Sequence, residues 1–349
     1  MPKNERTVKI GGVTIGGDHP VAIQSMLCCA LEDVEGNIAQ GKALEQAGCE
    51  IVRVTVPNAQ GVKLLSALKE TLTIPVVADI HYDYKMALEA VAAGADKIRL
   101  NPGNLSSPDQ VRQVAQACRN AGIPIRVGAN SGSVAADILA RHGGQPTAAA
   151  LAESALAQVH MLEQFDFNDL VVSIKASHVP TMVEACRIFA AQSDIPQHIG
   201  VTEAGTPRMG LVKSAIGIGS LLLEGIGSTL RVSLTADPVE EIRAAKDILL
   251  ACGLRRDRVE VVSCPTCGRC KVDVLTLAEK VEQMVENIRK PLTVAVMGCV
   301  VNGVGEGKQA DNGIAGGDGE YLLFKKGVAI QKYPMEGILE VLKAEIESM

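Results

Sequence analysis

Eight short runs of β-branched and aliphatic residues recur along the first part of the chain, and this repetition limits the possible fold most strongly. The runs are VAIQSM (21–26), IVRVTV (51–56), IPVVADI (74–80), KIRLNP (97–102), IPIRVGA (123–129), LVVSIKA (170–176), IPQHIGV (195–201) and TLRVSLT (229–235). Ala- and Glu-rich stretches of helical period separate them, which indicates parallel βαβ units. Eight such units within about 250 residues predict an α/β fold of the TIM (β/α)8 barrel type, because open doubly wound sheets have fewer strands.

The pattern of elements changes near residue 255, which predicts a second domain. The chain has 349 residues, and a single hydrophobic core stops growing at about 250–300 residues. We therefore expect a substrate-binding barrel domain over residues 1–255 and a small α+β domain over residues 256–349. In the second domain we expect a strand, a helix over 273–290, a strand, a glycine-rich loop, a short strand and a final helix. The segment VKIGGVTIGG near the N-terminus reads as a hairpin that closes the bottom of the barrel.

Five of the eight predicted barrel strands end in a basic residue. These are Arg53, Arg99, Arg126, Lys175 and Arg231. The active sites of TIM barrels lie at the C-terminal ends of the strands, so the five cations should meet at one mouth. Each could instead pair with a local carboxylate such as Asp79 or Glu203. Five unpaired charges are costly to bury, and guanidinium groups suit phosphate oxygens, so we expect a small, multiply anionic ligand.

Composition excludes some partners and a membrane location. The net charge is −6 and the chain has four Tyr, four Phe and no Trp, so it offers neither a basic field nor stacking rings for nucleic acid. The N-terminal segment is polar, and the most apolar later stretch is interrupted by Glu224, well short of the length that crosses a bilayer. We expect a cytoplasmic protein whose cysteines stay reduced.

Cysteines cluster in the second domain, where Cys264, Cys267 and Cys270 lie close together in SCPTCGRC and Cys299 follows in MGCVVNGVGEG. Thiolates that converge from separate turns suit either zinc or an iron–sulfur cluster, and the spacing alone does not choose between them or exclude a site without metal. The scattered cysteines are expected to be small buried core residues. They are Cys49, Cys118, Cys186 and Cys252.

Several motifs in order resemble the 4-hydroxy-3-methylbut-2-enyl diphosphate synthase family in its short bacterial form. They are VRVTVP, ADIHYDY, KIRLNPGN, GVTEAG, the segment from KSAIG to SLTADP, SCPTCGR, MGCVVNG and GIAGG. The resemblance implies a barrel followed by a reductase-like iron–sulfur domain. It also implies an oxidoreductase of the methylerythritol phosphate (MEP) pathway that reductively opens 2-C-methyl-D-erythritol 2,4-cyclodiphosphate, with flavodoxin or ferredoxin as electron donor. The implied 4Fe–4S ligands are Cys264, Cys267, Cys299 and Glu306.

The same resemblance implies roles for individual residues. Glu203 and Glu306 would be catalytic, Glu203 as proton donor and Glu306 as an exchangeable cluster ligand. The substrate-binding residues would be Arg53, His81, Arg99, Asn101, Arg126, Asn130, Lys175, Arg231 and Ser233. The family also implies a homodimer with composite active sites.

Three features depart from the family pattern. LCCAL at 27–31 replaces a polar stretch, Val304 and Gly307 alter the turn before and after Glu306, and Cys270 occupies a non-ligand position, which makes it an alternative ligand. Two other functions are considered. One is a barrel aldolase or synthase that acts on a phosphorylated substrate, with a structural zinc site. The other is a non-catalytic metal-binding interaction module, to which the cations at the barrel mouth are the strongest objection.

Overall fold

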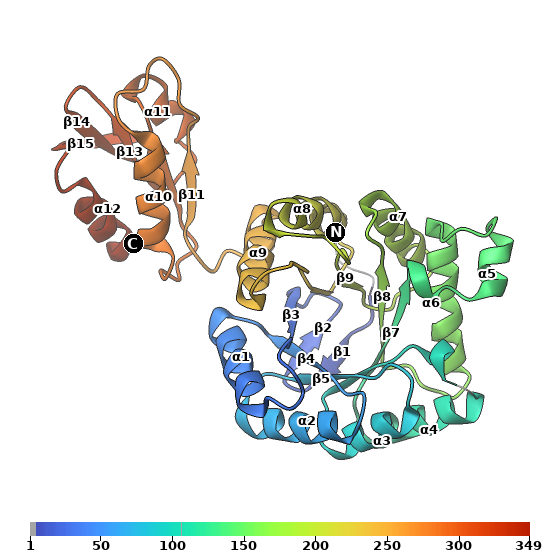
Figure 1. Cartoon of the computed structure of the whole chain (residues 1–349). Coiled ribbons are helices and arrows are strands. Elements are labelled where there is room, and N and C mark those ends of the chain that lie inside the picture. Colours follow the sequence, from blue (N-terminus) through green and yellow to red (C-terminus); the bar gives the residue numbers. More distant parts are fainter. Residues whose placement is uncertain (1–4, 106) are drawn as a thin grey trace. The chain divides into compact units, whose positions relative to one another are not determined.

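The protein is described by a computed structural model that covers residues 5–105 and 107–349. Its internal contacts divide the chain into two compact units, residues 1–254 and 255–349. The first unit is a ring of strands surrounded by helices and the second is a sheet with helices packed on it (Figure 1). Among the described residues, no helix is long and apolar enough to cross a membrane.

The first unit contains the eight parallel strands that the sequence predicts. They are β3 (Ala22–Met26), β4 (Ile51–Thr55), β5 (Val76–Asp79), β6 (Lys97–Arg99), β7 (Ile125–Asn130), β8 (Leu170–Lys175), β9 (His198–Ile199) and β10 (Thr229–Leu230). Their order in the sheet is β8-β7-β6-β5-β4-β3-β10-β9. A single bridge between Val172 and Gln197 joins β8 to β9 and almost closes the ring. The predicted TIM barrel is therefore confirmed.

Helices cover the outside of this ring. They are α1 (Val34–Ala47), α2 (Ala59–Thr71), α3 (Tyr84–Ala92), α4 (Pro108–Ala121), α5 (Ala136–Arg141), α6 (Ala148–Glu163), α7 (Val179–Ala190), α8 (Pro207–Leu223) and α9 (Pro238–Ala251), with 3-10 turns η1 (Pro102–Asn104) and η2 (Ser131–Ser133). Asp33, Asn58 and Ser107 accept backbone N–H bonds as N-caps, and Gly48 and Gly122 end α1 and α4 in the left-handed conformation. These local signals explain where the helices begin and end.

A hairpin closes the bottom of the barrel, as the sequence predicts. Strands β1 (Val8–Ile10) and β2 (Val13–Ile15) pair antiparallel. Their buried residues Val8, Ile10 and Ile15 form a cluster with residues of the barrel strands, among them Ala22 and Ile51 at the beginnings of β3 and β4. The hairpin therefore lies at the end of the barrel opposite the C-terminal ends of the strands.

The second unit is a five-stranded mixed sheet with three helices among its described residues. Its elements are β11 (Glu260–Ser263), α10 (Val274–Val285), β12 (Thr293–Met297), α11 (Val300–Glu306), β13 (Asn312–Gly316), β14 (Glu320–Lys325), β15 (Val328–Pro334) and α12 (Ile338–Ser348). Strands β11 to β13 are parallel, and β14 and β15 add antiparallel. The expected glycine-rich loop is wrong: this segment contains the helix α11 and the strand β13, and the sequence prediction also missed β15.

Close packing explains why glycines occur inside these elements. A Cβ on Gly303 of α11 would come within 2.7 Å of the Met297 Cβ on β12. A Cβ on Gly313 of β13 would come within 2.4 Å of the Phe324 ring. Glycine is required at both positions because the Met297 Cβ or the Phe324 ring lies too close to leave room for another Cβ. In the sequence, the same two glycines indicate a loop.

The cysteines of the first unit are mostly core residues. Cys49, Cys118 and Cys186 are buried, and Cys252 is half-buried. Burial raises the pKa of each of the three buried thiols to about 12. They are therefore neutral side chains in the core, as expected, and carry no thiolate chemistry.

Candidate active site

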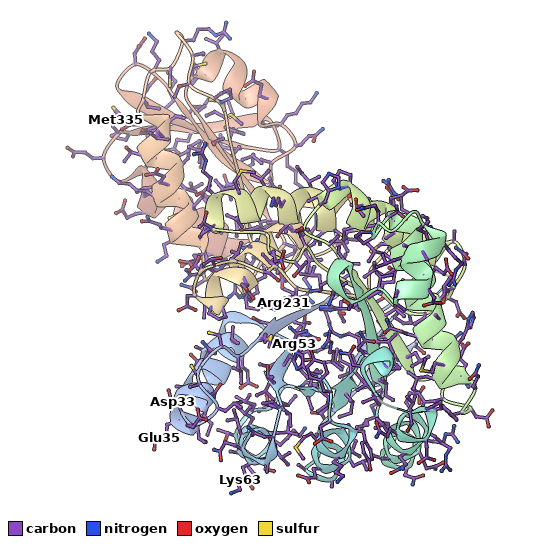
Figure 2. The ribbon with its side chains drawn as sticks, turned by 45° about the vertical axis from the view of Figure 1, so that its right-hand side comes forward. Asp33, Glu35, Arg53, Lys63, Arg231 and Met335 are labelled. Atoms are coloured by element: carbon purple, nitrogen blue, oxygen red, sulfur yellow. The ribbon has the colours of Figure 1, made fainter. Side chains whose placement is uncertain are left out.

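A polar cavity of about 220 Å³ lies at the C-terminal ends of the barrel strands. Its lining contains eight of the nine predicted substrate-binding residues: Arg53, His81, Arg99, Arg126, Asn130, Lys175, Arg231 and Ser233. Met26, Asp79, Gly128, Ser173 and Thr202 complete the lining. The sequence analysis did not assign Met26, Gly128, Ser173 or Thr202 to the site. Figure 2 shows Arg53 and Arg231 on the inner side of the barrel, whereas Glu35 and Lys63 lie on the outer helices.

The register of the parallel strands brings these side chains together. Asp79 on β5 pairs with Arg99 on β6, and Arg99 pairs in turn with Arg126 on β7. Asn130 pairs with Lys175 across β7 and β8. Residues at the same level of neighbouring strands lie side by side, so Asp79, Arg99 and Arg126 form one row. The expectation that all five cations end their strands is wrong for Arg53, in the middle of β4, and for Arg126, the second residue of β7, which therefore lies deeper in the barrel.

Two buried carboxylates balance only part of this positive charge. Asp79 lies 3.0 Å from Arg99 Nη1 and 3.5 Å from Arg53 Nε. Glu241 on α9 lies 3.3 Å from Arg231 Nε. Pairing with a local carboxylate, the alternative considered from the sequence, thus occurs for Arg53, Arg99 and Arg231. Arg126 and Lys175 have no carboxylate partner among the described residues.

Arg126 provides the clearest sign of a missing ligand. Its side chain is buried, and its Nε and Nη1 groups have no hydrogen-bond partner among residues 5–105 and 107–349. Burial, followed by repulsion from Arg53 and Arg99, holds the pKa of Arg126 well below its usual range. Buried donors are almost always satisfied in native proteins, so these N–H groups are suited to a bound anion.

Burial acts on the other cations of the cavity in the same direction. It lowers the pKa of Arg53 to about 10, although Asp79 opposes the shift. It also holds the pKa of Lys175 well below its usual value, with Arg231 and Arg53 adding to the effect. For Asp79, burial alone would raise the pKa, but the neighbouring Arg53 and Arg99 bring it below its usual value. Burial in this cavity therefore disfavours the positive charges, and a bound anion would stabilise them.

A deeper polar layer lies inside the barrel, and the sequence analysis missed its lysine. Lys97 is fully buried and donates to Gln24 Oε1 at 3.3 Å. Lys97 precedes Arg99 by two positions on β6, so the strand period places both on the same face. The two-residue period of the strand was the signal in the sequence that could have revealed Lys97. His198 is also fully buried, with its Nδ1 2.8 Å from Thr229 Oγ1, and burial followed by repulsion from Arg126 and Lys175 lowers its pKa, which keeps the ring neutral.

Gly200 allows two ends of strands to approach each other at the cavity. A Cβ at this position would lie 2.5 Å from the Arg231 carbonyl oxygen and 3.3 Å from Lys175 Nζ. A larger residue would move the backbone that carries Arg231. Gly200 thus sets the spacing between these two cations.

Two predicted residues do not line the cavity. The Asn101 Oδ1 accepts the Gly103 N–H at 3.0 Å and caps η1. Glu203 is exposed in the segment that follows β9, and its φ of 51° is in the left-handed region. Few residues other than glycine adopt this conformation, and such outliers gather at functional sites.

A second cavity, of about 140 Å³, lies in the C-terminal unit. Cys264, Cys267, Cys299 and Glu306 line it together with Pro265, Arg269 and Gly303. Cys299 directly precedes α11, and Glu306 is the last residue of that helix. Cys270 does not line the cavity: its thiol donates to the Val272 carbonyl at 3.1 Å. All four predicted ligands therefore surround one cavity and Cys270 lies outside it.

The donor set of this cavity fits an iron–sulfur cluster. Thiolates are the usual ligands of such clusters, and a carboxylate can occupy the remaining corner. Within the described part of the chain, no three Cys, His, Asp or Glu side chains are grouped as ligands of a single metal ion. The cavity nevertheless brings three thiols and one carboxylate together, which is the donor set that such a cluster takes.

The fold and the two cavities define a class of protein: a TIM-barrel enzyme for a multiply anionic substrate, with a cysteine-lined site in a second domain. Residues 5–246 match the GcpE TIM-barrel domain, and residues 260–348 match the GcpE protein C-terminal domain. The chain belongs to the GcpE family, and it is an oxidoreductase of the MEP pathway.

Two similar relatives span the whole chain. A 4-hydroxy-3-methylbut-2-en-1-yl diphosphate synthase (flavodoxin) from Caldanaerobacter subterraneus subsp. tengcongensis is 50% identical over 349 residues, which covers 100% of this chain and 98% of that protein. The protein of the same name from Ruminiclostridium cellulolyticum is 51% identical over 344 residues, 99% of this chain and 97% of that one.

The comparison with solved structures bears only on the fold of the barrel unit. Yersinia pestis dihydropteroate synthase superposes with a TM-score of 0.53 at 12% identity and covers 71% of this chain and 98% of that one. At this identity the likeness shows a shared fold and not a shared activity.

Proposed function

We propose that this enzyme forms 4-hydroxy-3-methylbut-2-enyl diphosphate by reductive ring opening of 2-C-methyl-D-erythritol 2,4-cyclodiphosphate, with flavodoxin as its electron donor. Family membership supports the reaction. The barrel cavity supports the choice of substrate, since five cations line it with one carboxylate, Asp79, while a second carboxylate, Glu241, pairs with Arg231 from outside the lining. The observation that carries the proposal is Arg126, which has two buried N–H groups without a partner in the described chain.

The cavity residues bind and orient the cyclic diphosphate. The N–H groups of Arg53, Arg99 and Arg126 donate to phosphoryl oxygens, and Lys175 supplies a point charge. His81, Asn130 and Ser233 line the same cavity and bind the remaining polar groups of the substrate. Asn101, two residues after Arg99, remains a proposed substrate-binding residue although it does not line the cavity and caps η1.

In the second unit, Cys264, Cys267, Cys299 and Glu306 would hold a 4Fe–4S cluster. When bound, the cluster would relay to the substrate the two electrons that flavodoxin donates. The three thiolates would hold the cluster most firmly, and the harder Glu306 oxygen would be the more easily displaced ligand. Glu203 holds the proton that goes to the hydroxyl oxygen that leaves as water.

The active form is a homodimer in the cytoplasm. An apolar groove of about 640 Å³ lies between α8 and α9, and its lining includes Leu211, Ile216 and Leu223. Ile216 is 58% exposed and Leu223 is 73% exposed. Contiguous exposed apolar surface marks an interface, and a second copy of the barrel is the occupant proposed for this mainly apolar groove, whose one charged lining residue is Asp247.

The anion site is tested with Arg126→Met, which removes the guanidinium and keeps much of its volume. We expect binding of the cyclic diphosphate to weaken by about 1.5–3 kcal/mol for each charged hydrogen bond lost. The melting temperature of the free protein should not fall, because the variant removes a buried unpaired charge. Calorimetric titration and thermal unfolding measure the two effects. Exposed Arg112, which pairs with Asp109, gives the control Arg112→Met. Unchanged affinity in Arg126→Met would contradict the proposal.

The metal site is tested by anaerobic purification with iron, sulfide and zinc measured beside a visible spectrum. We expect a brown protein with about four iron and four sulfide per chain. Replacing Cys264, Cys267 or Cys299 by Ser should remove the cluster, whereas Cys270→Ser should keep it. A colourless, folded protein that contains zinc would instead favour a barrel aldolase or synthase with a structural zinc site.

A further inference from the structure

Glu241 lies directly behind the barrel cavity without lining it. It belongs to the first turn of α9, its residue surface is 3% exposed, and its neighbour on the same turn, Glu240, is exposed. A buried carboxylate is costly unless its oxygens are fully engaged, so its contacts indicate what it does.

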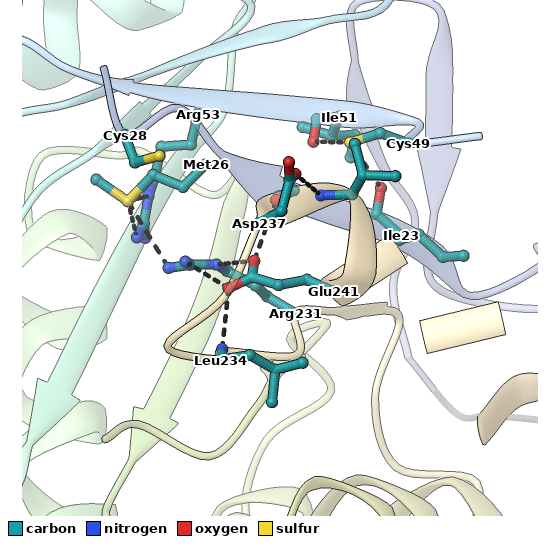
Figure 3. Close-up of polar contacts among 12 residues, drawn as sticks. Ile23, Met26, Cys28, Cys49, Ile51, Arg53, Arg231, Leu234, Asp237 and Glu241 are labelled. Atoms are coloured by element: carbon teal, nitrogen blue, oxygen red, sulfur yellow. Dashed lines mark hydrogen bonds and ion pairs between the residues drawn. The ribbon is translucent and has the colours of Figure 1, made fainter. Parts of the chain in front are cut away.

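Both carboxylate oxygens of Glu241 accept two hydrogen bonds each. Oε2 accepts from Ser25 Oγ at 3.1 Å and from Arg231 Nε at 3.3 Å. Oε1 accepts from Arg231 Nη2 at 3.3 Å and from the Leu234 backbone N–H at 3.0 Å. One side chain thus joins the strand β3, the cation Arg231 and the segment that follows β10 (Figure 3).

These contacts determine how Arg231 meets the cavity. Glu241 engages the Nε and Nη2 edge of the guanidinium, and the Nη1 group lies 3.7 Å from Met26 Sδ, a lining atom of the cavity. The bond to the Leu234 amide holds the backbone one residue after Ser233. Two of the proposed substrate contacts, the Arg231 side chain and Ser233, therefore depend on one carboxylate outside the cavity.

We propose that Glu241 is a positioning residue for the diphosphate: it holds Arg231 in the direction that presents Nη1 to a phosphoryl oxygen. This inference rests on the proposed function of the cavity. Glu241 also carries a negative charge near an anion site, which on its own would weaken anion binding. When the charge of Glu241 is removed, a positioning role predicts weaker binding of the diphosphate, whereas charge repulsion alone predicts tighter binding. The experiment below separates these two outcomes.

The test is a double-mutant cycle in the full chain, with the cyclic diphosphate titrated by calorimetry into the anaerobically purified, cluster-loaded protein in the absence of a reductant, so that no turnover occurs. Glu241→Gln keeps the shape of the side chain and removes its charge. We expect affinity to fall about tenfold in the presence of Arg231 and to change less than about twofold in the Arg231→Ala background, because coupled residues show such non-additivity. Glu241→Asp, which keeps the charge on a shorter side chain, should restore part of the affinity.

The matched control is Glu240→Gln, on the same helix turn, where Glu240 pairs with exposed Arg243 at 2.6 Å. It should bind as the unaltered chain does. Equal losses in both Arg231 backgrounds, with a lower melting temperature, would overturn the inference in favour of a role in folding. A gain of affinity in both backgrounds would overturn it in favour of simple repulsion. If Arg231→Ala alone leaves affinity unchanged, the proposed function of the cavity fails, separately from the role of Glu241.

Discussion

At the scale of single residues, the barrel cavity is a set of charges that the free protein tolerates poorly. Lys175 is the clearest case, because its pKa is held well below the usual value by burial and then by Arg231, Arg53 and Arg126, while Glu241 opposes them. A group in this state is ready to take up a proton when negative charge arrives. Ligand binding and protonation are therefore linked at this residue.

This linkage predicts a pH dependence of binding. An anion favours the charged form of Lys175, so binding takes up protons, and affinity should fall as pH rises through the lowered pKa. Calorimetric titration over a range of pH in buffers of different ionisation enthalpy measures the uptake. Lys175→Met should reduce it relative to the unaltered chain, and Lys63→Met on the outer helix α2 should not. Identical uptake in the Lys175 variant would assign the protons to another group, such as Lys97 or His198.

At the scale of elements, the short helix α11 determines where two predicted cluster ligands lie. Cys299 precedes the helix and Glu306 ends it. The helix can approach the sheet this closely only because Gly303 lacks a Cβ, as its Cβ would lie 2.7 Å from that of Met297 and 3.3 Å from that of Ala315. Both clashes involve the parts of side chains closest to the backbone, so rotation cannot relieve them.

Substitutions on this helix should have opposite effects on stability. We expect Gly303→Ala to destabilise the second unit by about 1–3 kcal/mol through overpacking. Gly305 is exposed and a Cβ there meets nothing within 4 Å, so Gly305→Ala should stabilise the helix by about 0.5–1 kcal/mol. Differential scanning calorimetry of both variants measures the difference. Equal effects would show that close packing does not decide which residue stands at position 303.

The barrel strands and the elements of the second unit show where prediction from sequence succeeds and where it fails. The eight barrel strands were predictable because each carries its own apolar run, and the five cations of the cavity were predictable because each lies in one of these runs. Gly303 and Gly313 read as loop signals because the neighbours that require them are distant in sequence. Glu241 was missed for the same reason: it lies on a helix, and only the folded barrel brings it to Arg231.

At the scale of the whole molecule, the apolar groove between α8 and α9 supports the proposed homodimer. Ile216 lies in this groove and is 58% exposed. A surface of this kind remains in water unless another copy covers it, and a dimer would place two barrel cavities in one particle.

We therefore expect Ile216→Glu to shift the protein toward the monomer, since a charge at a desolvated contact is strongly unfavourable. Sedimentation velocity over a range of concentrations measures the shift. Leu275 on α10 is 66% exposed, and Leu275→Glu is the control that removes an equally apolar residue from the second unit. A dimer that persists in Ile216→Glu would place the interface elsewhere.

The single bridge between β8 and β9 makes the barrel a split ring. Seven junctions between strands are ladders, but this one is the isolated pair Val172 and Gln197, supported by the bond from the Val172 N–H to the Pro196 carbonyl at 3.0 Å. Lys175 follows this junction on β8 and Thr202 follows it after β9, and both line the cavity. At this point of the rim, the two cavity residues stand on strands that no ladder joins, whereas the arginines of β4 to β7 stand on strands joined by ladders.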